Sequence, residues 1–198
     1  MTPGDVEDHM KRIIWGTAIM ATVTTVAAFR GIGAREPAAE TVARVERGHY
    51  LVESIGCADC HTPKKLGRNG PEPDLSRMLS GHPEGSRLPA PPMAGGPWSV
   101  TAAWDLTAWS GPWGVSYAMN ITPDQNTGIG IWTEDMFVSA LRTGRHMGVS
   151  RPILPPMPWQ AFRNLTDRDL KAIFSYLRTV APVHNRVPDP MFAPEATN

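Results

Sequence analysis

The stretch Cys57-Ala58-Asp59-Cys60-His61 decides how this chain of 198 residues is organised. Two cysteines at i and i+3, followed at once by a histidine, form the attachment motif of a c-type haem. One helical turn separates the two thiols by about the distance between the two porphyrin vinyl groups to which they add. The next residue then lies under the iron. We therefore expect one covalently attached haem c, held by Cys57 and Cys60, with His61 as its proximal ligand.

Three other uses of this motif remain open at this point. A structural zinc site needs four ligands, and the sequence has no second Cys or His pair at similar spacing. A redox pair needs no trailing histidine and belongs in a βαβ pattern, which is missing here. A plain disulfide is the third alternative. The chain has only these two cysteines, so no other thiol competes for the motif.

The composition limits the class of protein. Lys+Arg and Asp+Glu both number 19, and the isoelectric point is near 7.0. This balance argues against nucleic-acid binding and against a carrier that docks through a strongly basic face. With 20 prolines, 18 glycines and a mean hydropathy of -0.24, the chain is expected to be globular and rich in loops.

The first organised feature is IIWGTAIMATVTTVAAF at residues 13–29, which carries no charge and is bounded by Lys-Arg and by Arg. At about 1.5 Å per residue, it reaches the lower limit for crossing a hydrocarbon core. A cleaved signal peptide is the alternative, with Ile32-Gly33-Ala34 as a passable cleavage site, but its acidic start is unusual. We predict a cytoplasmic N-terminus at 1–12, a transmembrane anchor at 13–30 and a linker at 31–39.

The charges beside the apolar run predict its orientation. Lys11-Arg12 belong on the cytoplasmic side by the positive-inside rule, so the chain after Arg30 lies on the other side. Attachment of haem to CxxCH takes place on that outer side. We therefore expect a single-pass protein of a bacterial inner membrane, with its haem domain in the periplasm and the lipid bilayer as one partner.

The segment before the motif is expected to be helical from Glu40 to Gly56, with apolar side chains at helical spacing. The stretch RGHYLVESIGCADCH (47–61), which runs from this helix through the motif, resembles the opening of class I monohaem c-type cytochromes of the membrane-anchored bacterial respiratory type. The resemblance implies a mainly α cytochrome c fold at 40–185, with about three core helices around one haem, and a tail at 186–198. It also implies that Gly48 lets the last helix cross closely, with Tyr176 at the crossing.

Residues 62–118 contain 9 of the 20 prolines, 8 of the 18 glycines and 4 of the 7 tryptophans, without a helical period. A long segment of this kind is usually functional or disordered, and its tryptophans argue against disorder. We expect an ordered excursion that covers a haem edge, with a short hairpin near Trp98 to Trp109. Shielding of the porphyrin and docking of a partner subunit are both open roles.

The next stretch, NITPD followed by TGIGIWT, is dense in turn-forming residues. It also resembles the same cytochromes, in which it lies along the haem edge. That likeness implies Asn120, Thr122 and Trp132 as residues on the propionate side of the haem. Ordinary turn capping is the alternative for Asn120 and Thr122.

The stretch RPILPPMPWQ (151–160) contains the expected distal ligand. Met157 lies between Pro156 and Pro158, which stiffen the backbone and would hold a thioether in place. The resemblance also implies Met157, because the family carries its distal methionine in such a loop before the last helix. The rival ligands are Met147, Met191, His146 and His184. Trp159 is expected to pack either beside the haem or in the core.

Two further helices are indicated by their caps. Thr133 with two following acidic residues predicts a helix that Gly144 ends. Thr166 begins the last helix, which carries apolar residues at i, i+3, i+4 and i+7 and stops before Pro182.

With both axial positions filled, the expected function is one-electron transfer rather than catalysis, in or beside a respiratory or photosynthetic membrane complex. The expected partners are subunits of a membrane-bound dehydrogenase, oxidase or similar redox complex. A haem enzyme or small-ligand sensor with a labile distal methionine is one alternative, in which His146 acts as an acid or base. A mainly structural subunit of a membrane complex is the other. The sequence has no further catalytic motif.

Overall fold

The computed structural model describes residues 38–91 and 99–193. The expected anchor at 13–30, the N-terminus at 1–12 and most of the linker therefore lie outside the described residues. Among the residues that are described, no helix is both long and apolar enough to cross a membrane.

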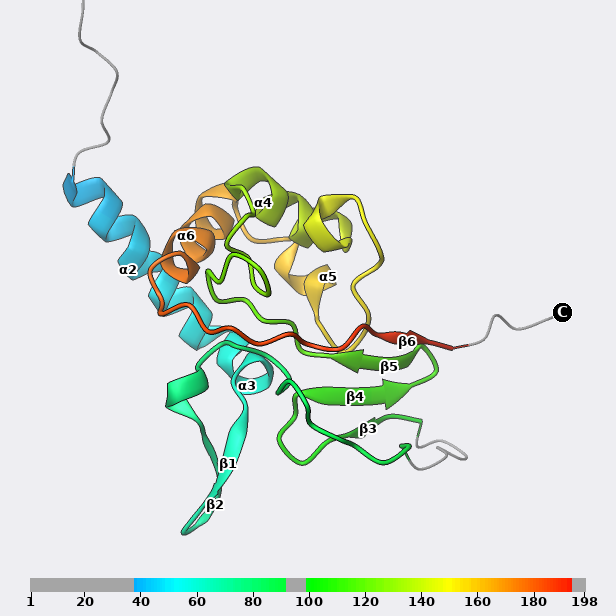
Figure 1. Ribbon diagram of the computed structural model, residues 1–198. Helices are drawn as coiled ribbons and strands as arrows, with labels where there is room; N and C mark the ends of the chain where they lie inside the picture. Colours follow the sequence, from blue (N-terminus) through cyan, green and yellow to red (C-terminus); the bar gives the residue numbers. More distant parts are fainter. Residues whose placement is uncertain (1–37, 92–98, 194–198) are drawn as a thin grey trace, which may run out of the picture. The chain divides into compact units, whose positions relative to one another are not determined.

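Three helices form the frame of the domain (Figure 1). The pair α2 and α6 makes the most extensive contact between elements, and α4 packs against α6. Two short helices, α3 and α5, carry residues that border the interior. Within residues 38–91 and 99–193 the α-helices are α2 Ala38–Ser54, α3 Cys57–His61, α4 Glu134–Thr143, α5 Trp159–Phe162 and α6 Asp167–Leu177.

The core lies between these helices and includes Val52 from α2, Phe137 and Leu141 from α4, and Leu170 and Phe174 from α6. The rings of Phe137 and Phe174 are 5.4 Å apart between centroids. The apolar face that the sequence predicts for this helix is only partly buried. Val42 is 56% exposed, whereas Gly48, Leu51 and Val52 are buried.

The predicted helix ends are found where the capping residues place them. The Thr133 hydroxyl accepts a hydrogen bond from the Met136 amide at 3.1 Å, and Gly144 ends α4 in the left-handed region at φ 68°. The Thr166 hydroxyl accepts from the Asp169 amide, also at 3.1 Å. Each of these bonds satisfies a backbone donor that the first turn of a helix leaves without a partner.

Gly48 lies where α2 and α6 cross, as the sequence implied. A Cβ atom at this position would lie 2.0 Å from the Ala172 carbonyl oxygen and 2.8 Å from Tyr176 Cβ. The rings of His49 and Tyr176 are 4.8 Å apart between centroids at the same crossing. The absence of a side chain therefore allows the two helix backbones to approach closely.

In the part of the chain that the structure describes, the fold is less purely helical than the sequence suggested, because two small antiparallel sheets accompany the helices. One is the hairpin of β1 and β2, followed by the 3₁₀ turn η1, and the other has the strand order β3-β4-β5-β6. A second 3₁₀ turn, η2, follows α4. The bounds are β1 Lys64–Gly67, β2 Gly70–Pro73, η1 Leu75–Arg77, β3 Thr101–Ala102, β4 Ala108–Gly111, β5 Gly114–Tyr117, η2 His146–Gly148 and β6 Met191–Phe192.

The chain after α6 runs back across the domain to β6, which pairs with β5 (Figure 1). Buried Asn185 holds this return segment in place. Its amide nitrogen donates to the carbonyls of Ser80 and His82, at 2.7 and 2.8 Å, and its side-chain oxygen accepts from the Glu84 amide at 2.7 Å. The Asn185 side chain thus links the excursion after the CxxCH motif to the C-terminal segment, in addition to the pairing of β5 with β6.

We predict that Gly48→Ala lowers the free energy of unfolding by about 1–3 kcal/mol, because the added methyl group would overlap the Ala172 carbonyl. Denaturant unfolding followed by circular dichroism measures this change. The control is Glu46→Ala, at an exposed position on α2, for which we expect a change within about 0.5 kcal/mol. Equal stability of the two variants would contradict the close crossing.

Candidate haem site

The CxxCH motif begins directly after a sharp turn. Gly56 has φ 74°, in the left-handed region that favours glycine, and it connects α2 to the single helical turn of α3. Cys57 and Cys60 are both free thiols in this structure and both are partly buried. Burial raises the pKa of Cys57 to about 12 and also raises the pKa of Cys60. Both sulfur atoms are therefore protonated at neutral pH before any attachment.

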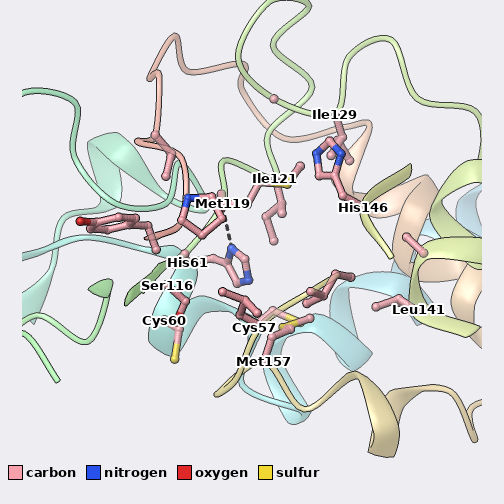
Figure 2. A pocket seen from close by; sticks show the side chains of 18 of the residues that line it. Cys57, Cys60, His61, Ser116, Met119, Ile121, Ile129, Leu141, His146 and Met157 are labelled. Atoms are coloured by element: carbon pink, nitrogen blue, oxygen red, sulfur yellow. Dashed lines mark hydrogen bonds between the residues drawn. The ribbon is translucent and has the colours of Figure 1, made fainter. Parts of the chain in front are cut away.

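His61 is held by a single strong hydrogen bond. Its Nδ1 lies 2.7 Å from the Met119 carbonyl oxygen, drawn as a dashed line in Figure 2. A carbonyl only accepts, so Nδ1 is the protonated nitrogen and Nε2 keeps its lone pair for a metal. Burial lowers the pKa of His61, and the Met119 carbonyl partly offsets this. The imidazole is thus neutral and oriented as a ligand.

The residues around the motif enclose a cavity of about 820 Å³. This volume lies within the range of about 300–1,000 Å³ that is typical of ligand pockets. Core side chains form much of its wall, among them Ile129, Phe137, Leu141, Ile173 and Leu177. The cavity is therefore apolar, as a porphyrin requires, and it opens directly onto Cys57, Cys60 and His61.

Met157 reaches the same cavity from a different part of the chain (Figure 2). It lies in the loop between η2 and α5, where the Pro155-Pro156 bond is cis. The loop is also tied to the sheet, because the Ser116 hydroxyl on β5 donates to the Pro155 carbonyl at 2.6 Å. The structure thus brings Met157 and the CxxCH motif to one cavity, although about a hundred residues separate them in the sequence.

The rival ligands differ in their positions. Met147 and His146 also line the cavity, as does Met119. Met191 belongs to β6 and is 53% exposed, and His184 lies 3.6 Å from the Asp124 carboxylate on the surface. Met191 and His184 are absent from the cavity wall.

These residues fit a haem c. The two thiols are at the attachment spacing, the free Nε2 of His61 is a ligand for iron, and a thioether faces the same apolar space. Haem also explains why a wall of apolar side chains surrounds an open volume in an otherwise packed domain. With haem attached, Cys57 and Cys60 would hold the porphyrin covalently, and His61 and Met157 would be the axial ligands.

Asn120 and Thr122 do not line the cavity. Both are fully buried, and the Asn120 side-chain oxygen accepts from the Thr122 amide at 3.0 Å and from its hydroxyl at 2.7 Å. The Asn120 amide nitrogen donates to the Val183 carbonyl at 2.8 Å and to the Thr127 hydroxyl at 3.1 Å. In this structure they cap the turn and anchor the chain after α6, which was the alternative for these two residues.

The two tryptophans expected near the haem have different positions. Trp132 lines the cavity, and its ring meets His146 edge-on at 5.1 Å between centroids. Trp159 is not in the cavity wall. It lies against Gly144, where a Cβ atom would be 2.3 Å from the indole, and the Arg163 guanidinium lies over its ring at 5.9 Å from the centroid. Trp159 thus supports the end of α4.

Several wall residues were not identified from the sequence. The excursion contributes Trp109, Ser116 and Tyr117, so part of it does cover the cavity. The segment after residue 185, expected only as a tail, contributes residues 186–190. Met119, which orients His61, belongs to the polar turn that follows the excursion. None of these positions has a local signal, because each is defined by contacts between distant segments.

An apolar cavity that a helical frame closes over CxxCH defines a c-type haem domain. The comparison with protein families agrees, since residues 45–181 match the model described as Cytochrome c. This chain belongs to the cytochrome c family, and Cys57 and Cys60 fit the covalent attachment of its haem c.

Similar proteins carry names of dehydrogenase subunits. The fructose dehydrogenase cytochrome subunit of Gluconobacter japonicus is 33% identical over 81% of this chain and 28% of its own length. The gluconate 2-dehydrogenase cytochrome c subunit of Pantoea cypripedii is 31% identical over 71% and 24%. A nicotinate dehydrogenase subunit of Pseudomonas putida is 31% identical over 75% and 10%. The chain thus spans less than a third of the length of each of these relatives.

We predict that Met157→Ala abolishes the weak red absorption band that marks methionine bound to ferric haem, because alanine has no sulfur to offer. The control is Met147→Ala, which removes another cavity methionine and should leave the band in place. Absorption spectra of the two purified haem proteins test this. Loss of the band in Met147→Ala alone would assign the ligand to Met147 instead.

We predict that Asn120→Ala lowers the free energy of unfolding by about 1–3 kcal/mol, because it leaves buried partners without hydrogen bonds. The reduction potential should change little, since Asn120 is outside the cavity wall. Denaturant unfolding and a redox titration measure the two effects, with exposed Asn164→Ala as the control. A shifted potential at unchanged stability would instead support a role beside the haem.

Proposed function

We propose that this chain is a membrane-anchored monohaem cytochrome c that carries single electrons between membrane redox partners. The observation that carries the proposal is the shared cavity of His61 and Met157, which offers a ligand for each axial position of one haem. Bound haem c supplies an iron that alternates between ferrous and ferric states, and methionine ligation favours the ferrous state. An iron with both positions filled has no site for a substrate.

The protein's own residues serve this function in three ways. The core side chains around the cavity exclude water, and the His61–Met119 hydrogen bond fixes the proximal ligand. The rim of the cavity includes exposed apolar side chains, among them Ile131, Pro156, Pro158 and Pro188. Electrons would cross this uncharged part of the rim, where a partner surface can approach without the cost of burying charges.

The anchor remains part of the proposal. Its support is the uncharged run at 13–29 and the Lys-Arg pair before it, which would orient the haem domain towards the periplasm. A membrane anchor would confine the domain to the bilayer surface and raise its effective concentration beside membrane partners.

The proposed electron donor is a membrane dehydrogenase. The support for this donor is the set of similar proteins, several of which are named cytochrome subunits of fructose, gluconate or alcohol dehydrogenases. The substrate of that dehydrogenase is left open by this likeness, because the named relatives act on different compounds and are much longer than this chain.

His146 favours a second candidate function, because this histidine lines the cavity. In a haem enzyme or small-ligand sensor, Met157 would dissociate and neutral His146 would act as a base beside the bound ligand. Burial, together with the charge of Arg151, lowers the pKa of His146 and keeps it neutral. Carbon monoxide distinguishes the two functions, since it binds ferrous haem only where the distal position is open.

We predict that a dehydrogenase substrate reduces this haem in membrane vesicles that contain the full chain. Fructose, gluconate, nicotinate and a primary alcohol are supplied separately without oxygen, and the haem is followed by difference spectra. Vesicles lacking the chain, and vesicles with Met157→Ala, are the controls. Reduction by at least one substrate in the wild type, with slower reduction in the variant, is the expected result.

Two results would contradict the proposed electron transfer from these dehydrogenases. If dithionite reduces the haem but none of the four substrates does, a dehydrogenase of these types is not the donor. If the reduced native protein binds carbon monoxide readily, the distal site is open and the enzyme or sensor function replaces electron transfer. Resistance of the chain to alkaline extraction from the vesicles tests the anchor independently.

A further inference from the structure

The loop between η2 and α5, which carries Met157, has few backbone donors that could hold it in place. Four of its residues are prolines, which have no N–H to donate. They are Pro152, Pro155, Pro156 and Pro158. The Ile153 amide donates to the Gly144 carbonyl at 2.8 Å, and the Met157 carbonyl accepts from the Trp159 amide at 2.9 Å. Between these two bonds, the loop can be tied to the rest of the domain chiefly through its carbonyl groups.

Ser116 on β5 makes a tie of this kind. Its hydroxyl donates to the Pro155 carbonyl at 2.6 Å, two residues before Met157. Within residues 38–91 and 99–193, this is the only hydrogen bond that joins residues 154–158 to any segment other than α5, which follows them directly. Ser116 and Met157 border the same cavity (Figure 2). The sheet therefore holds the loop close to the point where it presents the thioether.

The surroundings of Ser116 direct its hydroxyl hydrogen to the loop. The Trp113 indole N–H donates to the Ser116 oxygen at 3.3 Å, so this oxygen accepts one bond and donates the other. The Trp113 carbonyl accepts in turn from the Ala193 amide at 3.0 Å, directly after β6. Ser116 is only 8% exposed, so water has little access to compete for the hydroxyl. A chain of hydrogen bonds thus runs from the sheet edge to the loop of the expected distal ligand.

We propose that Ser116 is a positioning residue for the distal ligand, and that its hydrogen bond to Pro155 sets how firmly Met157 stays on the iron. The inference rests on Met157 as a ligand in the proposed electron carrier, and it does not depend on which protein donates the electron. Movement of the loop that takes Met157 off the iron would break this bond. A buried hydroxyl and a carbonyl would then lose their partners, which is costly.

The size of the effect follows from an equilibrium between a closed loop, with Met157 on the iron, and an open one. Imidazole binds the ferric haem only where Met157 has left, so its apparent affinity is reduced by the fraction of protein that is open. Loss of one net hydrogen bond would multiply that fraction by about 3–10-fold. Removal of the Ser116 hydroxyl should therefore tighten imidazole binding by the same factor.

The test is a titration of the ferric, haem-loaded full chain with imidazole, for the wild type, Ser116→Ala and Ser110→Ala, each with and without Met157→Ala. Ser110 is the matched control, since it is a half-buried serine on β4 of the same sheet and is absent from the cavity wall. We expect tighter binding in Ser116→Ala and wild-type binding in Ser110→Ala. In the Met157→Ala background, Ser116→Ala should have no effect, because no ligand remains to be displaced.

The pair Ser116→Thr and Ser116→Val decides the question if the alanine variant does not fold. Both side chains are β-branched and suit a strand, and they differ in one hydroxyl group. Ser116→Thr should keep the wild-type affinity for imidazole, whereas Ser116→Val should show the increase. Denaturant unfolding of the same variants reports any purely structural role, which would change the free energy of unfolding and leave the affinity for imidazole unchanged.

Equal imidazole affinities for the wild type and the variants without the hydroxyl would overturn the proposal. An increase of the same size in the Met157→Ala background would also overturn it, because the effect would then come from added space in the cavity wall. Failure of the proposed electron carrier would appear differently. The wild type would then bind imidazole as tightly as Met157→Ala does, whichever residue stands at position 116, and the function and this inference would fail together.

Discussion

The hydrogen bond from His61 to the Met119 carbonyl is the contact on which the rest of the site depends. It selects the imidazole tautomer and leaves one nitrogen for the iron. It also joins the CxxCH turn to a segment that is 58 residues away. The Gly81 amide donates to the His61 carbonyl at 2.7 Å, so the backbone of the ligand is held as well. The proximal ligand is thus held by Gly81 of the excursion and by Met119 of the turn after it, both outside its own helix.

This constraint gives the long excursion a physical role. Residues 62–118 connect His61 to Met119, and Gly81 within this excursion contacts the His61 backbone. Two buried asparagines hold the chain after α6, because the Asn120 amide donates to the Val183 carbonyl and the Asn185 amide donates to the Ser80 carbonyl in the excursion. That chain then contributes to the cavity wall and pairs with β5. Shielding of the haem is therefore built from segments that are distant in sequence and tied by side-chain amides.

The sequence predicted the features whose causes are local. The CxxCH motif, the caps at Thr133 and Thr166, the αL glycine at 144 and the glycine at the helix crossing all depend on neighbouring residues or on one repeated spacing. It did not predict which polar residues face the cavity. Asn120 and Arg151 both lie in loops, and only long-range contacts bury the first in a turn and turn the second towards the cavity.

The two ends of the cavity therefore differ in how they would hold a haem. At one end, Cys57, Cys60, His61 and Met157 would hold the haem, so little further binding energy would be needed there. At the other end, Trp132, His146 and Arg151 have polar groups that apolar walls cannot satisfy. Since covalent attachment would already prevent the haem from leaving, the polar side chains at this end are not needed to retain it. The loop before Met157 would then add contacts to the haem that its retention by CxxCH does not require.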